Sequence, residues 1–94
     1  MMQNLCLNGV WYAKKENGGR LPFMAPGEVV DIIEEKHNIY DPNALSVRYE
    51  SVHVGYVPAK ITHRIKARTA TIVRVDMGEV PPLVVIRVEM TDKE

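Results

Sequence analysis

Residues 37–44, which read His-Asn-Ile-Tyr-Asp-Pro-Asn-Ala, hold the side chains best suited to binding chemistry in this sequence. An ionised aspartate such as Asp41 accepts hydrogen bonds and donates none, and the ring of Tyr40 offers a face for stacking. The following proline favours extended or turn conformations at Asp41, and Asn43 tolerates a left-handed one. The segment also fits a simple connection between strands, in which Asn38, Asp41 and Asn43 bond the loop backbone. That interpretation leaves Tyr40 unexplained.

The sequence offers no catalytic or metal-binding constellation beside this segment. The three histidines, His37, His53 and His63, are not spaced as metal ligands are. The single cysteine, Cys6, has no second cysteine with which to bind a metal. We expect Cys6 to pack within a strand rather than to act as a nucleophile. The glycines after Asn17 form a turn without the strand and helix that a phosphate-binding loop needs. We therefore expect no enzyme, and no zinc or other cofactor.

The charges cancel overall but are unevenly distributed. The formal net charge is zero, which argues against non-specific electrostatic affinity for nucleic acid. Residues 51–75 nevertheless contain no acid, while five cations fall among them: Lys60, Arg64, Lys66, Arg68 and Arg74. Such a block is typical of a solvated face, and it would also suit a surface that follows phosphates. We expect Glu34 and Glu35 to form a solvated acidic pair.

The length of 94 residues suits one domain, which we expect to span residues 1–91, followed by a frayed tail at 92–94. No apolar run approaches the roughly 20 residues needed to cross a bilayer, and the start has no signal-peptide pattern. One cysteine cannot form an internal disulfide. A cytoplasmic protein without a membrane partner is therefore the expectation.

Short runs bounded by turn residues predict an all-β fold with one short helix. The expected strands cover residues 3–12, 28–36, 44–50, 53–57, 67–76 and 83–90, with a long loop at 14–27. The segment 28–36 also fits a helical stripe, but its β-branched residues favour a strand. Pro58 at a first helical position, followed by Ile61 and Ile65, predicts a helix over 58–66. Six such strands close most economically as a small OB-like β-barrel, which removes exposed edges.

Two motifs at a fixed spacing resemble a known family. The first runs Asn38-x-Tyr40-Asp41-Pro42-Asn43-Ala44-Leu45-x-Val47, and the second is Val54-Gly55-Tyr56-Val57-Pro58, followed by the expected short helix. Together they resemble the HIRAN domain. That domain occurs at the N-terminus of the helicase-like transcription factor and of related chromatin-remodelling ATPases, and as stand-alone proteins of bacteria and phages. The strong match covers residues 28–66, while the other strands agree in pattern only.

This resemblance implies a modified OB-like β-barrel that captures the 3′ end of single-stranded DNA. Tyr40 would then stack on a base, Asp41 would meet the terminal 3′-hydroxyl, and Asn38 would be a nearby polar contact. Residues 9–12 look similar to the family's Gly-x-Arg-Tyr segment, with tryptophan in place of arginine, so Tyr12 would be a second stacking ring. The full set of implied nucleic-acid-binding residues is Trp11, Tyr12, Asn38, Tyr40, Asp41, Asn43, Tyr56, Lys60 and Arg64.

The leading hypothesis is a module for single-stranded nucleic acid that recognises 3′ DNA ends. It would serve DNA repair or replication, with a helicase or another repair protein as a further partner. The alternative is a protein-interaction or structural module that keeps the fold without the DNA pocket. An exposed patch of Trp11, Phe23 and Met24 would favour this alternative. The choice between DNA and RNA, and the oligomeric state, stay open.

The surroundings of three tyrosines separate these hypotheses. An open pocket formed by Tyr12, Tyr40 and Tyr56 with Asp41 would favour nucleic-acid binding, because stacking needs accessible ring faces. Packing of the same rings inside the core would reject it.

Overall fold

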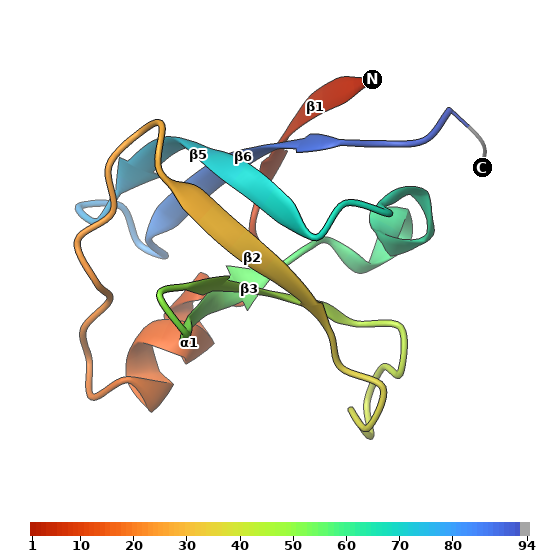
Figure 1. Ribbon diagram of the computed structural model, residues 1–94. Helices are drawn as coiled ribbons and strands as arrows, with labels where there is room; N and C mark the ends of the chain where they lie inside the picture. The colour runs from red at the N-terminus through yellow and green to blue at the C-terminus, as the bar shows by residue number, and fades with distance from the viewer. Residues whose placement is uncertain (93–94) are drawn as a thin grey trace.

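The computed structural model describes residues 1–92 and consists of six strands, one α-helix and one 3₁₀ helix (Figure 1). In chain order these are β1 Met2–Cys6, α1 Val10–Glu16, β2 Val29–Glu34, β3 Leu45–Tyr49, β4 Val52–Tyr56, the 3₁₀ helix η1 Ala59–Arg64, β5 Thr69–Asp76 and β6 Leu83–Glu89. The predicted all-β class and number of strands are confirmed, including the strand at 28–36 whose pattern also fitted a helix. Residues 93–94 of the predicted tail lie outside the described residues. Within the described part of the chain, no helix is long and apolar enough to cross a membrane.

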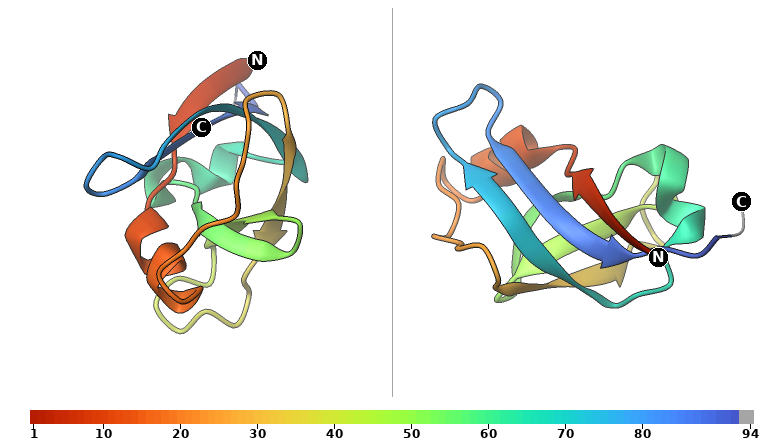
Figure 2. Two further views of the ribbon diagram at one scale, coloured as in Figure 1. Left: turned by 90° about the vertical axis from the view of Figure 1, so that its left-hand side faces the viewer. Right: turned by 90° about the horizontal axis from the view of Figure 1, so that it is seen from above.

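All six strands form one curled sheet with the order β1-β6-β5-β2-β3-β4. Every neighbouring pair is antiparallel. The pairing register shifts at Val47 in β3 and at Ile72 in β5, and such bulges bend a strand and increase its twist. The sheet therefore curls into a half-barrel, and Figure 2 shows the strands wrapping around a common interior.

The segment after β1 brings the two edges of the sheet together. Leu7 N donates to Val84 O at 2.9 Å, so this segment still follows β6. One residue later, Asn8 and Tyr56 exchange both backbone hydrogen bonds, at 2.8 and 2.7 Å. Gly55 makes this approach possible, because a Cβ there would lie 3.0 Å from Leu7 Cβ and 3.1 Å from Asn8 O. A single bridged pair thus joins the β1 side of the sheet to β4.

Apolar side chains at alternate positions fill the interior of the half-barrel. β2 buries Val30 and Ile32, while the residues on either side of them are exposed. β6 buries Val84, Ile86 and Val88 in the same alternating way. This period of two is what a strand with one face on a core requires. The β-branched runs that predict the strands therefore also supply the core.

The predicted first strand over 3–12 is wrong in its second half. The chain turns at Gly9, whose φ of 69° is left-handed, and α1 begins at the next residue. Val10 and Ala13, three positions apart on one face of α1, are buried, and the helix packs against β4. Strand propensity is weak and depends on context, so this packing decides the structure. The helix also takes the first residues of the predicted loop at 14–27.

The predicted helix over 58–66 is the shorter 3₁₀ helix η1. Pro58 precedes this helix rather than opening it, with φ of −53° and ψ of 131°. Ile65 follows it in an extended conformation and is buried, whereas Ile61 is only partly buried. Helices of the 3₁₀ type stay short because their hydrogen-bond geometry is poorer than that of an α-helix. The amphipathic pattern therefore correctly predicts a helix in this segment, but the helix type and ends differ.

Two further expectations about burial are corrected. Cys6, expected to be packed, is exposed at the end of β1. Met24 is buried in the core, whereas Phe23 is 89% exposed. The apolar part of the 14–27 loop thus packs Leu21 and Met24 onto the half-barrel, so the predicted exposed patch of Trp11, Phe23 and Met24 lacks Met24.

Replacing Gly55 by alanine tests the close approach between β4 and the segment after β1. The added methyl group must displace Leu7 or the backbone of Asn8. Overpacking of this kind typically costs about 1–3 kcal/mol. We expect Gly55→Ala to lower the free energy of unfolding by that amount, measured by urea denaturation.

Gly78→Ala is the matched control for this substitution. Gly78 lies in the exposed turn between β5 and β6, where an added methyl group would contact only the side chain of Asp76, at 3.3 Å. It should change stability by no more than about 0.5 kcal/mol. Equal stabilities of Gly55→Ala and the unsubstituted protein would contradict the close approach.

Candidate functional site

The connection between β2 and β3, residues 35–44, is held in one shape by its own side chains. Asn38 Oδ1 accepts from the backbone N–H groups of Tyr40 and Asp41, at 2.9 and 3.0 Å. These two bonds fix the orientation of the amide, so Asn38 Nδ2 donates to Glu35 Oε1 at 3.1 Å. The loop is therefore ordered by the protein itself, and we call it the 35–44 loop.

Asp41 bonds the loop through one carboxylate oxygen and leaves the other open. Its Oδ1 accepts from Asn43 N at 2.9 Å, and its backbone oxygen accepts from Ala44 N at 3.0 Å. Within residues 1–92 no protein group bonds Oδ2, and the residue is partly exposed. An open acceptor on a fixed carboxylate can receive a hydrogen bond from a ligand hydroxyl.

Tyr40 stands almost free of the protein surface. The residue is 92% exposed, and Ile39 before it is similarly exposed. Its backbone N–H is held by Asn38, so the point from which the ring projects is fixed. An aromatic ring in this position has faces available to stack on a base.

Tyr56 joins the 35–44 loop to the rest of the domain. Its hydroxyl donates to Glu35 Oε1 at 2.9 Å. Its ring meets the His53 ring edge to face, with centroids 4.6 Å apart. On another side it packs against Gly9, where a Cβ would lie 3.3 Å from Tyr56 Cδ2. Tyr56 is thus partly buried and fixed, at the surface rather than in the core.

Glu35 is the residue of the candidate site that the sequence did not reveal. The expected solvated pair is wrong for this member, because only Glu34 is exposed. Glu35 Oε1 receives both the Tyr56 hydroxyl and the Asn38 amide. Its Oε2 lies 3.7 Å from Arg48 Nη2. In the sequence, the one indication of this role is that Glu35 stands three residues before Asn38. That spacing is common and does not predict a contact.

The network of polar contacts continues from β4 to α1. His53 Nδ1 lies 3.8 Å from Glu16 Oε2, and the His53 side chain is only 12% exposed. His53 Nε2 is buried and has no hydrogen-bond partner among residues 1–92. One connected series of side chains therefore links α1 to the 35–44 loop: Glu16, His53, Tyr56, Glu35 and Asn38.

Trp11 and Tyr12 lie in the first turn of α1 rather than on a strand. Both are exposed, at 50% and 68%. Lys14 Nζ lies 6.0 Å from the centroid of the Trp11 ring, at the outer limit of a cation–π contact. Within the described part of the chain, no ring contact joins either residue to Tyr40 or Tyr56. The structure leaves both rings accessible without closing them into a pocket with Tyr40.

Lys60 and Arg64 both lie on η1, but only Lys60 is free. Lys60 is exposed and makes no ion pair within residues 1–92. Arg64 Nε donates to Thr91 O at 3.2 Å, and Thr91 N donates to Arg64 O at 2.8 Å. Arg74 lies 3.6 Å from Asp76 in an ion pair. Two cations of the acid-free window at 51–75 are thus bound within the protein.

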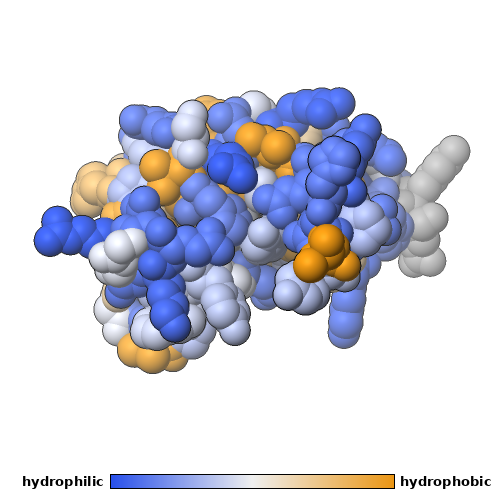
Figure 3. Space-filling model, turned by 90° about the horizontal axis from the view of Figure 1, so that it is seen from below, coloured by the Kyte–Doolittle hydropathy of each residue, from blue (hydrophilic) through white to orange (hydrophobic). Residues whose placement is uncertain are grey.

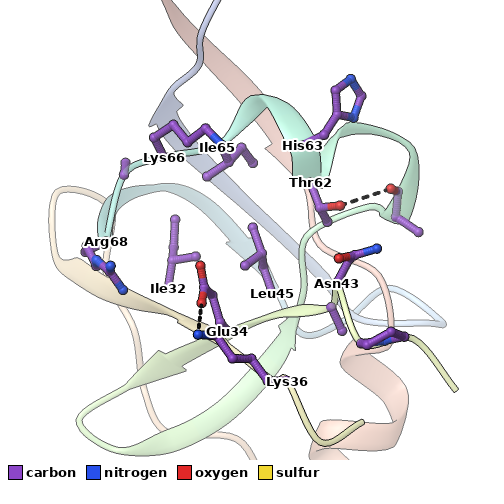
Figure 4. Close-up of a pocket in the computed structure, with 14 residues that line it drawn as sticks. Ile32, Glu34, Lys36, Asn43, Leu45, Thr62, His63, Ile65, Lys66 and Arg68 are labelled. Carbon is purple, nitrogen blue, oxygen red and sulfur yellow. Dashed lines mark hydrogen bonds and ion pairs between the residues drawn. The ribbon is translucent and has the colours of Figure 1, made fainter. Parts of the chain in front are cut away.

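A groove of about 700 Å³ lies beside the 35–44 loop, between the ends of β2 and β3 and the chain around η1. Figure 4 shows Ile32 and Leu45 in its middle, with Lys66 and Arg68 on one side and Asn43 on the other. Among the predicted site residues that the structure describes, only Asn43 lines this groove. The groove is therefore adjacent to Tyr40 and Asp41 along the chain without being formed by them.

The face onto which α1 and the 35–44 loop project is mostly hydrophilic, with separate apolar patches (Figure 3). Within residues 1–92, no three His, Cys, Asp or Glu side chains gather closely enough to hold a metal ion. The groups that this region offers a ligand are exposed aromatic rings, one open carboxylate oxygen and a set of cations.

Comparison with known proteins gives a match at the level of the family. The model described as the HIRAN domain matches residues 6–79 of the 94-residue chain. The matched segment runs from the end of β1 to the turn after β5, so it contains α1, the 35–44 loop and η1. No curated protein and no solved structure matches the chain.

The partly buried hydroxyl of Tyr56 gives the site a measurable response to alkaline pH. Burial, together with the hydrogen bond to Glu35, raises the pKa of Tyr56 to about 12, from the ordinary value of about 10. The folded protein therefore holds this proton more tightly than the unfolded chain does. Its stabilising contribution is complete below about pH 10 and is lost as the pH rises through about 12.

We expect Tyr56→Phe to flatten the fall in unfolding midpoint between about pH 10 and about pH 12, measured by urea denaturation. Tyr49→Phe is a control for specificity, since the hydrogen bond to Glu28, with burial, also raises the pKa of Tyr49 to about 12. Only Tyr56→Phe should also change the chemical shift of the Asn38 side-chain amide in NMR spectra. Parallel stability profiles for Tyr56→Phe and the unsubstituted protein would contradict the bond to Glu35.

Proposed function

Because the chain belongs to the HIRAN domain family, we propose that it binds single-stranded DNA and captures the 3′-hydroxyl end of the strand. HIRAN domains are known as DNA-binding modules and are not catalytic. One observation carries the finer proposal: the 35–44 loop fixes Tyr40 and Asp41 next to each other. The first offers an exposed ring and the second an open carboxylate oxygen.

Tyr40 would stack on the base of the terminal nucleotide. Stacking on an aromatic side chain is worth about 1–3 kcal/mol per base and tolerates any base, since every base has a π-face. The ring needs no rearrangement of the loop, because Asn38 already holds the backbone at Tyr40. Binding of this kind would select single strands without reading their sequence.

Asp41 would recognise the chain terminus. A free 3′-hydroxyl can donate a hydrogen bond to the open Oδ2, whereas a phosphate in the same place would bring a second negative charge to a carboxylate. Two unit charges 4 Å apart repel by about 1 kcal/mol even in bulk water, and by more beside a protein. The same carboxylate would therefore favour a terminus and disfavour an internal nucleotide.

The other residues of the proposed site position or extend this pair. Asn38 and Tyr56 act as positioning residues, because both are bonded to Glu35, which holds the loop against β4. Trp11 and Tyr12 add exposed ring faces on α1, on which a neighbouring base would stack. Asn43 and Lys60 would supply further polar contacts with the strand, whereas Arg64, also predicted for this role, is bonded to Thr91.

A protein-interaction module without a DNA site is the competing function. An exposed patch of Trp11, Phe23 and Met24 would favour it, but Met24 is buried, so only Trp11 and Phe23 of the three are exposed. Single exposed apolar side chains are common on protein surfaces. A stable dimer, together with no binding to any oligonucleotide at low salt, would favour this alternative.

The chemistry of the strand end tests the role of Asp41. By fluorescence polarisation, an oligonucleotide with a 3′-hydroxyl should bind about tenfold more tightly than the same strand with a 3′-phosphate. Asp41→Asn keeps an oxygen for the bond from Asn43 but removes the charge, so it should abolish most of this preference. Asp31→Asn, an exposed position on β2, is the control and should preserve it. Equal affinity of the unsubstituted protein for both ends would remove the proposed role of Asp41.

The stacking role of Tyr40 is tested by removing and restoring its ring. Tyr40→Ala should weaken binding by about 5- to 150-fold, the equivalent of about 1–3 kcal/mol, while Tyr40→Phe should retain most of the affinity. Phe23→Ala removes an equally exposed aromatic ring elsewhere and should have no effect. Unchanged binding by Tyr40→Ala, with circular dichroism showing an intact fold, would reject this contact.

A further inference from the structure

We propose that the groove beside the 35–44 loop binds the sugar-phosphate backbone of the nucleotides that precede the 3′ terminus, with Lys66 and Arg68 as its phosphate contacts. The proposal rests on the proposed capture of a 3′ end, and it assigns the rest of the strand a route and a direction across the domain. The groove shares its Asn43 wall with the loop that would hold the terminal nucleotide.

Continuity between the two places comes from Asn43. Its backbone N–H donates to Asp41 Oδ1 at 2.9 Å, and the same residue lines the groove. Pro42 and Ala44, on either side of it, line the groove as well. A DNA strand whose terminal hydroxyl reaches Asp41 would therefore lie close to the groove, because the groove begins at the next residue, Pro42.

Lys66 and Arg68 are the cations of the acid-free window that remain available at the groove. Both are exposed, and within residues 1–92 neither makes an ion pair or a side-chain hydrogen bond. By contrast, Arg64 and Arg74 are bonded to other parts of the protein. Figure 4 shows Lys66 and Arg68 on the same side of the groove, where both could contact one passing backbone.

The distribution of charge sets the direction of the strand. The terminal site is acidic, since Asp41 and the partly buried Glu35 lie there with one arginine, Arg48. At the groove the balance of charge is reversed, because Glu34, the one carboxylate among the described residues that line it, is already in an ion pair of 3.7 Å with Lys36. Phosphates are thus repelled at one place and attracted at the other. A hydroxyl end at Asp41 with phosphates at the groove satisfies both.

The size and floor of the groove fit a nucleotide rather than a bare ion. Its volume of about 700 Å³ lies in the range of about 300–1,000 Å³ that is typical of sites for organic ligands. Ile32 and Leu45 lie in its middle and, although both are largely buried, leave a small apolar surface between the polar walls (Figure 4). Such a surface suits a sugar or the face of a base, while the walls hold the phosphate.

Salt dependence and strand length together test this route. Fluorescence polarisation would measure oligonucleotides with 3′-hydroxyl ends and increasing length at about 50 to about 200 mM salt. For a single strand, loss of one phosphate contact lowers the slope of log affinity against log salt by about 0.7. We expect this change in Lys66→Ala and in Arg68→Ala. The double variant should also lose most of the gain in affinity that the unsubstituted protein shows with longer strands.

Arg87→Ala is the matched control, because it removes the same charge from β6, outside the groove, where Arg87 donates to Asn4 at 3.1 Å. Its salt slope should equal that of the unsubstituted protein. If the double variant keeps the salt slope, the 3′-hydroxyl preference and the need for Tyr40, the groove does not bind the phosphates. The proposed function would then still stand. Absence of any oligonucleotide binding by the unsubstituted protein would overturn both. Tight binding of a free mononucleotide that depends on Lys66 and Arg68, without any effect of strand length, would make the groove a nucleotide pocket and reject the strand route.

Discussion

The carboxylate of Glu35 is the constraint on which the site depends. One of its oxygens receives both the Tyr56 hydroxyl and the Asn38 amide, and hydrogen bonds to a charged acceptor are worth about 1.5–3 kcal/mol each. Tyr56 is held in turn by its backbone bridge to Asn8 and by the close packing of Gly9. The pair that joins the sheet edges therefore also anchors the loop. Without Glu35, the Asn38 turn would keep its local bonds but lose its fixed relation to β4 and α1.

The fold separates two kinds of charge that the sequence mixes. Acids outnumber lysines and arginines by seven to five in residues 1–50, and the ratio is reversed in residues 51–94, so the net charge is zero. Some of these charges form ion pairs, as Glu35 does with Arg48. Glu35 turns toward Tyr56 and Asn38, while Lys66 and Arg68 stay unpaired within residues 1–92 at the far wall of the groove. Neutrality suppresses general attraction to nucleic acid, and local separation still allows a strand to be oriented. A small domain can thus favour an end over an internal site without a strongly basic surface.

The sequence predicts the features that depend on local residue patterns, and it misses those that depend on contacts between distant segments. Five of the strands follow from alternation and β-branching, and the loop motif points to Tyr40 and Asp41 because turn chemistry is local. The segment Val10-Trp11-Tyr12 has equally good strand propensity, but burial of Val10 and Ala13 against β4 makes it a helix. Glu35 gains its role only when the end of β2, the middle of the loop and β4 converge. No spacing in the sequence encodes that convergence.

Capture of a terminal nucleotide alone falls short of useful affinity. In the proposed site, a base stacked on Tyr40 would give about 1–3 kcal/mol, and a hydrogen bond to charged Asp41 would give about 1.5–3 kcal/mol. Micromolar binding requires about 8 kcal/mol after the loss of translational and rotational freedom, which itself costs at least about 4 kcal/mol. The preordered 35–44 loop reduces the ordering cost but adds no attraction. Because the chain has no net charge, the deficit has to be met by contacts along the preceding nucleotides. In the proposed route, Lys66 and Arg68, which make no ion pair within residues 1–92 and line the groove next to Asn43, would supply these contacts.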